Sequence, residues 1–142
     1  MPYKYIPWNS ALEIGHTLID NQHKQLIITV NELFDAHSNN KGRQEVGRVM
    51  DFLVDYTIKH FDDEEELQRE IGYPQYSEHK ISHEKFKDTA QEMAEKLSQH
   101  GPTDDFISTV CTAIGLWVVD HIMNEDFQMA EYIPGQEQDD RI

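Results

Sequence analysis

Apolar side chains recur at steps of three and four residues along most of this chain, which is the spacing of one face of an α-helix. Four such stretches, separated by short polar segments, span about residues 20–38, 43–70, 74–100 and 104–133. Long amphipathic helices with short connections favour an all-α fold, an antiparallel up-down-up-down four-helix bundle.

Capping residues predict where these helices begin and end. Asp20 is a favourable N-cap for the first helix, and Thr103 or Asp104 for the fourth. Gly72 is expected to stop the second helix, since glycine readily adopts the left-handed conformation found there. Pro74 is expected to open the third helix, where its missing N–H leaves no hydrogen bond unmade.

The ends of the chain lack this periodicity. Residues 1–18 hold two prolines, a glycine and Trp8, and we expect an irregular N-terminal arm whose tryptophan packs over the core. Pro134 and Gly135 should end the last helix, and residues 134–142 form a polar tail. No repeat or linker divides the sequence, so we predict one domain over 1–142, with the bundle at 19–133.

Each of the four apolar stripes also contains histidine. Residues four apart share a helix face, so His60 pairs with Glu64 and His79 with His83. One core histidine is usually satisfied by a hydrogen bond, but five imidazoles and two carboxylates in one core are costly without a metal centre. The predicted metal-binding set is His23, His60, Glu64, His79, His83, His121 and Asp126.

The helical pattern slips by one residue after His121. Asn124 and Gln128, the next positions in register, are polar, and the inward side resumes at Asp126. We predict a π-bulge here, a single wide turn that swings Asp126 toward His121. On an ideal α-helix the two side chains would be separated by roughly 140°, and on a wide turn by roughly 50°.

The ligand types narrow the choice of metal. No cysteine lies near the set, which excludes thiolate zinc and iron–sulfur sites. Five imidazoles and two carboxylates are too many for one zinc and too rich in nitrogen for calcium or magnesium. Two carboxylates can bridge two ions while the imidazoles are terminal, which suits iron, with manganese or zinc as substitutes.

Composition bears on partners and location. The net charge of -15 repels nucleic acid and anionic membranes, so we expect neither as a partner. We find no apolar run of about 18 residues that would predict a membrane span, and no signal-peptide pattern. The single cysteine, Cys111, allows no internal disulfide and suits a reducing compartment, so we expect a cytoplasmic protein. The sequence identifies no protein partner.

Over essentially its whole length the chain resembles a bacterial haemerythrin. The matching segments are Trp8, residues 19–23, residues 60–65, residues 72–74, residues 79–86 and residues 117–126. They contain the ligand pattern H…HxxxE…HxxxH…HxxxxD with no ligand missing. Small departures occur near the site: Leu67 and Gln68 stand where a methionine is common in the family, and Val118 where a leucine is common.

The resemblance implies an asymmetric di-iron centre. One iron would be held by His79, His83 and His121, the other by His23 and His60, with Glu64, Asp126 and an oxo or hydroxo group as bridges. The second iron then has an open position where O2 binds and is held as hydroperoxide, its proton coming from the bridging hydroxide. The resemblance therefore implies a reversible oxygen-binding protein for storage, delivery or sensing, rather than an enzyme.

Oxygen binding of this kind needs a dry, apolar pocket, because water would protonate bound peroxide and promote autoxidation. Positions next to the ligands predict its lining. These are Leu26, Phe61, Trp117, Val118 and Ile122. Ordinary core packing also explains each of them, and the two interpretations are compatible.

The main alternative is a di-iron redox enzyme or sensor, such as a peroxidase, an oxidase or a nitric oxide-handling protein. Ferritin-like di-iron sites are rich in carboxylates and use two Glu-x-x-His pairs on bundle helices. Here the only such pair, Glu13 and His16, lies outside the bundle. The nitrogen-rich set favours oxygen carriage. An interaction or sensory module is a third possibility, but no output domain or signalling coiled coil is seen.

Overall fold

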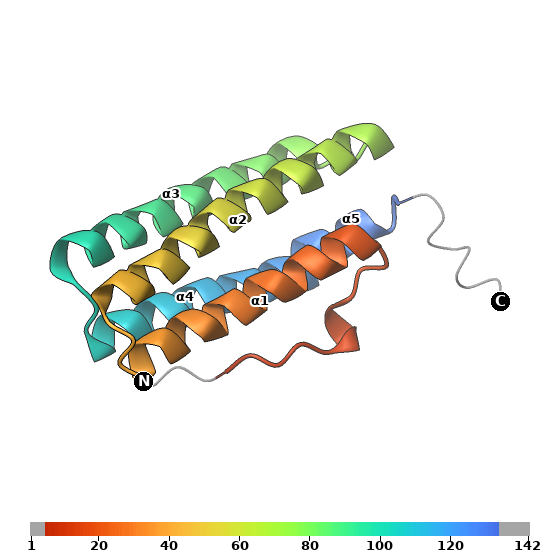
Figure 1. Ribbon diagram of the computed structural model, residues 1–142. Helices are drawn as coiled ribbons and strands as arrows, with labels where there is room; N and C mark the ends of the chain where they lie inside the picture. The colour runs from red at the N-terminus through yellow and green to blue at the C-terminus, as the bar shows by residue number, and fades with distance from the viewer. Residues whose placement is uncertain (1–4, 134–142) are drawn as a thin grey trace.

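The computed structural model describes residues 5–133 of the chain. Its four long helices lie side by side, each antiparallel to the next along the chain (Figure 1). The elements are a 3-10 turn (Ser10–Leu12), α1 (Thr17–Ser38), α2 (Arg43–Ile71), α3 (Tyr76–His100), α4 (Asp104–His121), the wide turn η2 (Ile122–Asp126) and α5 (Phe127–Ala130). The all-α bundle predicted from the apolar periodicity is confirmed.

The start of α1 differs from the prediction. His16, not Asp20, is the N-cap, and its Nδ1 accepts from the backbone N–H of Ile19 at 3.3 Å. Asp20 lies inside the first turn, where its carboxylate accepts from the backbone N–H groups of Ile14 and Gly15 at 2.8 and 3.2 Å. The prediction of Asp20 as the cap was wrong because this carboxylate binds the arm instead of the helix end.

Of the other predicted helix ends, those at Gly72 and Thr103 are confirmed and the one at Pro74 is wrong. Gly72 ends α2 in the left-handed conformation (φ 67°), as expected. Thr103 caps α4 by accepting from the backbone N–H of Phe106 at 3.1 Å. Pro74 does not open α3, which begins at Tyr76 with Gln75 as its N-cap. The predicted stop at Pro134 and Gly135 lies outside the described residues.

The helices pack around one apolar core. α1 lies against α2 and α4, and α2 also lies against α3. Ile19, Val30 and Leu33 of α1 are each fully buried, and burying a side chain of this size stabilises the fold by about 1.5–3 kcal/mol. Cys111 is also fully buried, and burial raises the pKa of its thiol to about 12, as expected for an inert core cysteine.

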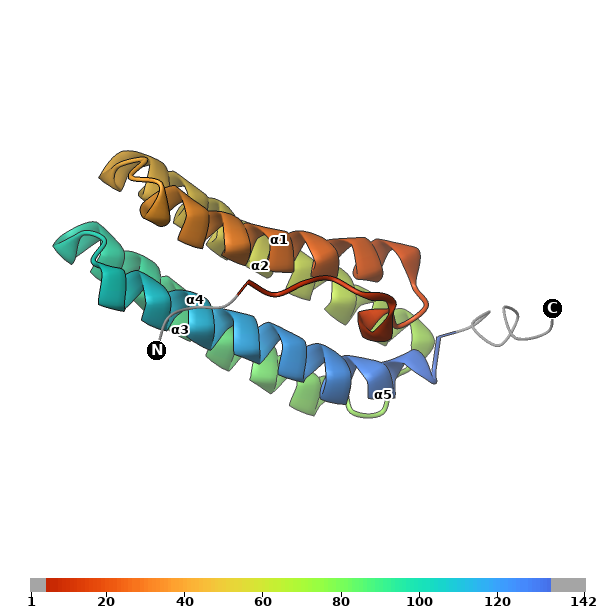
Figure 2. The ribbon, with the colours of Figure 1, turned by 90° about the horizontal axis from the view of Figure 1, so that it is seen from below.

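The N-terminal arm runs over the face formed by α1 and α4 (Figure 2). Asn31 of α1 holds it: its Oδ1 accepts from the backbone N–H of Ile6 at 3.1 Å, and its Nδ2 donates to the carbonyl of Ile6 at 3.0 Å. Trp8 is partly buried and packs against the core, which confirms the role predicted for it.

One continuous helical stretch, Asp104–Ala130, is long and apolar enough to cross a membrane by length and composition alone. The expectation that the chain has no such run was therefore wrong. In this fold the stretch comprises α4, η2 and α5, which together form the fourth rod of the four-helix bundle. Ile107, Ile114 and Ile122 on it are at most 1% exposed. A core helix passes the same test, so the stretch is only weak support for a membrane span.

Candidate metal centre

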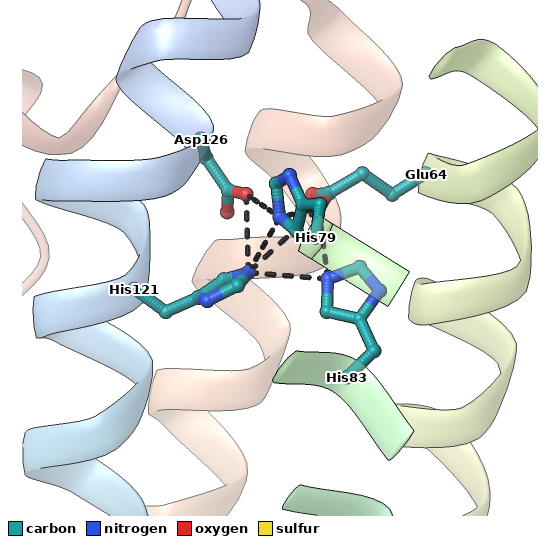
Figure 3. Close-up of side chains that lie close together, drawn as sticks. All are labelled: Glu64, His79, His83, His121 and Asp126. Atoms are coloured by element: carbon teal, nitrogen blue, oxygen red, sulfur yellow. Dashed lines mark hydrogen bonds and ion pairs between the residues drawn. The ribbon is translucent and has the colours of Figure 1, made fainter. Parts of the chain in front are cut away.

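Seven polar side chains from all four rods meet inside the bundle, and each is at most 4% exposed. They are His23 on α1, His60 and Glu64 on α2, His79 and His83 on α3, His121 at the end of α4 and Asp126 in η2. The structure thus brings together every residue of the predicted metal-binding set. Figure 3 shows five of them pointing toward one another from three different rods.

The wide turn η2 brings Asp126 into this group. It spans Ile122–Asp126, and the backbone N–H after it, on Phe127, donates to the carbonyl of Ile122, five residues back. Asp126 is fully buried, and its Oδ1 lies 3.3 Å from His121 Nε2. The predicted π-bulge is confirmed, and it explains why a carboxylate five residues after a histidine can share its site.

Three imidazoles form one half of the cluster. His79 Nε2 and His83 Nε2 lie 2.8 and 3.1 Å from His121 Nε2. Glu64 Oε1 lies 3.1, 3.2 and 4.0 Å from the Nε2 atoms of His79, His83 and His121 in turn. Asp126 Oδ1 is 3.0 Å from His79 Nε2. Five donor atoms therefore surround one point.

Two imidazoles form the other half. His23 Nε2 lies 2.9 Å from Asp126 Oδ2 and 3.5 Å from Glu64 Oε2. His60 Nε2 lies 3.3 Å from the same Glu64 oxygen. Each carboxylate therefore turns one oxygen to the three-histidine group (His79, His83, His121) and the other oxygen to the two-histidine group (His23, His60). This is the arrangement that bridging carboxylates need.

The donor spacing fits metal ions at both points. A bond of about 2.0–2.1 Å from a metal to an imidazole nitrogen places neighbouring donors about 3 Å apart and opposite donors about 4 Å apart. The observed separations, from 2.8 to 4.0 Å, fall in this range. Within residues 5–133, both oxygens of Glu64 and of Asp126 are buried without a hydrogen-bond partner. Buried carboxylates left in this state are costly, and a bound cation would satisfy them.

Side chains outside the cluster fix the orientation of four imidazoles. Gln22 Oε1 lies 2.8 Å from His60 Nδ1, and the amide of Gln68 lies 2.7 Å from His79 Nδ1. Glu65 Oε2 lies 2.8 Å from His83 Nδ1, and Glu125 Oε2 lies 2.9 Å from His121 Nδ1. At His60, His83 and His121 the partner is an oxygen, which accepts from Nδ1–H and so leaves the lone pair of Nε2 pointing into the cluster; at His79 the nearer atom is Gln68 Nε2.

Sequence reasoning missed these four partners. Gln22, Glu65 and Glu125 each stand next to a predicted ligand in the chain, and Gln68 lies one turn after Glu64. Adjacent polar residues on a helix normally point toward solvent, so their position alone did not distinguish them. A helical-wheel test for polar residues just beside the apolar stripe is the signal that could have found them.

Without a cation, protons must balance the charge of this cluster. Burial alone would lower the pKa of His23, but Asp126 and Glu64 outweigh burial and raise it to about 9. The same competition raises the pKa of His79 to about 9 and that of His121 to about 10. Burial also opposes ionisation of Glu64, yet the surrounding histidines hold the pKa of its carboxyl well below the usual range.

The pKa values of Asp126 and His60 are also shifted. Burial and the neighbouring Glu64 oppose ionisation of Asp126, but His121 and His23 lower the pKa of its carboxyl. Burial dominates at His60 and lowers the pKa of its ring. The carboxylates are therefore held ionised in the core, where either histidinium protons or metal ions must neutralise them.

A small cavity of about 10 Å³ adjoins the two-histidine group. That volume is near the lower limit for holding one water molecule. The structure places all five residues of the predicted pocket around it: Leu26, Phe61, Trp117, Val118 and Ile122. Thr57 and Phe86 also line it and were not predicted. The hydroxyl of Thr57 donates to the carbonyl of Leu53 at 2.7 Å. Its hydrogen is therefore already used, and the hydroxyl adds little polarity to the cavity wall.

Aromatic rings stack on two of the imidazoles, those of His83 and His121. Phe61 stacks on His83, with ring centroids 3.9 Å apart. Trp117 stacks on His121 at 4.3 Å and on Phe86 at 4.0 Å. These contacts restrict ring rotation, so the donor atoms are held in place before any metal binds.

Comparison with known proteins finds relatives over most of the chain. Residues 15–133 match the family described as "Hemerythrin HHE cation binding domain". "Bacteriohemerythrin" of Stenotrophomonas maltophilia is 36% identical over 126 residues, which cover 89% of this chain and 80% of that protein. "Myohemerythrin" of Sipunculus nudus is 27% identical over 128 residues, covering 90% and 92%. The solved structure titled "Crystal structure of hemerythrin:wild-type" has a TM-score of 0.80 at 26% identity and covers 92% of this chain and 98% of its own.

Proposed function

Because the chain belongs to the haemerythrin family, we propose that it binds O2 reversibly at two iron ions held by the seven clustered side chains. The observation that carries this proposal is the division of the two carboxylates. Glu64 and Asp126 each direct one oxygen to three imidazoles and the other to two. A site for one ion would not need both oxygens of both groups.

The proposed ligands follow the two halves of the cluster. His79, His83 and His121 would hold one iron, His23 and His60 the other, and Glu64 and Asp126 would bridge them. A solvent-derived oxo or hydroxo group would complete the bridge. When bound, the iron pair supplies two electrons and an open coordination position for O2. That position would lie at the two-histidine group, which offers one protein ligand fewer.

The surrounding residues would exclude water from this position. The cavity is lined by both imidazoles of the two-histidine group, His23 and His60, and by only His121 of the three-histidine group. Leu26 and Ile122, at most 2% exposed, close it with apolar side chains. Its volume of about 10 Å³ leaves no room for a larger substrate, and the side chains around it would have to move outward to admit O2. An apolar wall also favours O2 over water, because water loses hydrogen bonds on entry.

We propose oxygen binding rather than catalysis as the main activity. Apart from the proposed ligands, none of the residues lining the cavity has an ionisable side chain. The cavity therefore offers no separate acid to protonate bound oxygen and drive its reduction. Oxygen storage, delivery or sensing in the cytoplasm remains the predicted role.

The test is an optical titration of the iron-loaded, anaerobically reduced protein. We expect two irons per chain and a ligand-to-iron charge-transfer band that appears in air and disappears on degassing, over several cycles. Protein loaded with zinc provides the control and should show no band. Permanent oxidation on first exposure to air would reject reversible binding and favour a redox enzyme or sensor.

A further inference from the structure

We propose that Glu65 and Glu125 are positioning residues that make the three-histidine group the tighter of the two metal positions, so that the centre fills in a fixed order. This inference rests on the proposed two-metal site. It assigns a role to two carboxylates that contact no other part of the cluster directly. Their effect would be transmitted through the rings of His83 and His121.

The outer partners of the imidazoles differ in charge between the two halves. His83 and His121 each contact a carboxylate through Nδ1, at 2.8 and 2.9 Å. In the two-histidine group, His60 contacts the neutral amide of Gln22, and His23 Nδ1 has no hydrogen-bond partner among the described residues. Both direct carboxylate partners therefore stand behind the same metal position.

A carboxylate behind a ligating imidazole increases the basicity of the nitrogen that faces the metal. The side chain of Glu65 is only 5% exposed, so solvent screens its charge weakly. Lys80 Nζ lies 4.0 Å from Glu65 Oε1, but its side chain is 47% exposed and offsets that charge only in part. Glu125 is more exposed, and the hydroxyl of Ser82 donates to its Oε2 at 3.2 Å, which restrains it.

Behind the two-histidine group, the carboxylate of Asp63 reaches an imidazole only through the side chain of Gln22. Asp63 Oδ2 accepts from Gln22 Nε2 at 2.7 Å, so the whole amide of Gln22 separates this carboxylate from His60. Lys59 Nζ donates to the same oxygen at 2.8 Å and offsets part of its charge, although the lysine side chain is 63% exposed. The charge on this side is therefore both more distant and already paired. A metal at the two-histidine position would gain less from it.

His79 of the three-histidine group has a neutral partner, Gln68. As placed, Gln68 Nε2 faces Nδ1 while Gln68 Oε1 is buried without a partner. With His79 bound through Nε2, its Nδ1–H must donate, so the amide turns by about 180° and Oε1 accepts. Gln68 then orients the ring without adding charge, which leaves the asymmetry to Glu65 and Glu125.

The test is a calorimetric titration of the full-length, metal-free protein with Co2+ under argon, followed in parallel by the visible spectrum. We expect a tight and a weak binding step. Glu65→Gln or Glu125→Gln should weaken the tight step by about 10- to 100-fold and leave the weak step within about threefold. Glu66→Gln is the matched control, since this exposed neighbour removes the same charge and should change neither step.

Two further variants identify the steps. His83→Ala should abolish the tight step, and His23→Ala the weak one. The double variant Gln22→Glu/Asp63→Asn replaces the amide next to His60 with a carboxylate and removes the more distant carboxylate, so the net charge stays constant. It should tighten the weak step by about tenfold, which a purely structural role of Glu65 and Glu125 would not predict.

The outcomes separate this inference from the proposed function. If wild-type protein binds two Co2+ but the glutamine variants weaken both steps equally, or neither, the inference is wrong and the two-metal site stands. If wild-type protein binds fewer than two ions, both are wrong. Circular dichroism checks that each variant folds, and the partly exposed Glu125 supplies a second test if Glu65→Gln does not fold.

Discussion

Trp117 lies nearly parallel to the imidazole of His121: the ring centroids are 4.3 Å apart and the planes differ by 13°. The indole also stacks on Phe86, with ring centroids 4.0 Å apart and planes that differ by 14°. The tryptophan thus lines the cavity and fixes a proposed metal ligand at the same time. Stability and site geometry are coupled through this one side chain.

Replacing Trp117 by leucine should therefore destabilise the fold. Three ring contacts are lost, with His121, Phe86 and Phe61, each worth about 0.5–1.5 kcal/mol, so we expect the free energy of unfolding to fall by about 1.5–4.5 kcal/mol. Urea denaturation of the metal-loaded protein measures this. Leu116→Ala, at the neighbouring exposed position, is the control and should change stability by less than about 0.5 kcal/mol. Equal effects of the two variants would count against a special role for the stack.

Polarity of the cavity wall should set how fast the oxygenated protein autoxidises. Ile122 is 1% exposed and lines the cavity, so Ile122→Thr would place a hydroxyl beside the O2 position. Ile122→Val is the matched control, because valine and threonine have nearly the same shape. We expect the threonine variant to autoxidise at least about threefold faster than the valine variant, since the hydroxyl can hold water and donate a proton. The decay of the oxygenated absorption band gives both rates, and equal rates would refute the prediction.

Removing the metal should make stability strongly dependent on pH. In the metal-free cluster the pKa of His23 and of His79 is raised to about 9 and that of His121 to about 10, above the unfolded value of 6.5. Protons bound only in the folded state stabilise it fully below pH 6.5, and this stabilisation is lost as pH rises through 9 to 10. The carboxyl pKa values are lowered, so a second loss is expected as pH falls below the ordinary carboxyl range.

Urea midpoints measured at pH 6, 8 and 10 test this dependence. The metal-free protein should lose stability over this series. The metal-loaded protein should change much less, because a ligated Nε2 binds no proton. A metal-free midpoint that is constant from pH 6 to pH 10 would show that the histidines are not protonated in the folded state.

Deleting Asn124 should remove the wide turn. This exposed residue lies within η2, and its loss would let the helix continue with regular hydrogen bonds. Asp126 would then follow His121 by four residues along the chain, which separates the two side chains by roughly 40° on a regular helix and keeps them on one face. We expect the variant to keep two ions per chain with helix content little changed, and loss of either ion would show that the wide turn itself is needed, beyond a shared helix face. Asn124→Ala keeps the chain length and should retain both ions, which metal analysis and circular dichroism can compare.

The extra residue before Asp126 could be recognised in the sequence because it interrupts a long apolar stripe. Likewise, His60 shares a helix face with Glu64, and His79 with His83, however the helices pack, because residues four apart lie one turn apart on any α-helix. Periodicity along one chain is local information. It was sufficient for the four rods, the π-bulge and the seven inward-facing polar side chains.

Contacts between rods depend on how each helix is rotated and placed, which local periodicity does not encode. Only the tertiary structure decided that Glu65 turns inward to His83 while the adjacent Glu66 faces solvent. It also decided that Asp20 binds the backbone of the arm, because the helix begins at Thr17 and the arm folds back over its first turn. The sequence by itself determined which groups could meet. The packing of the rods determined which oxygen faces which imidazole, and so where each charge lies around the proposed metal centre.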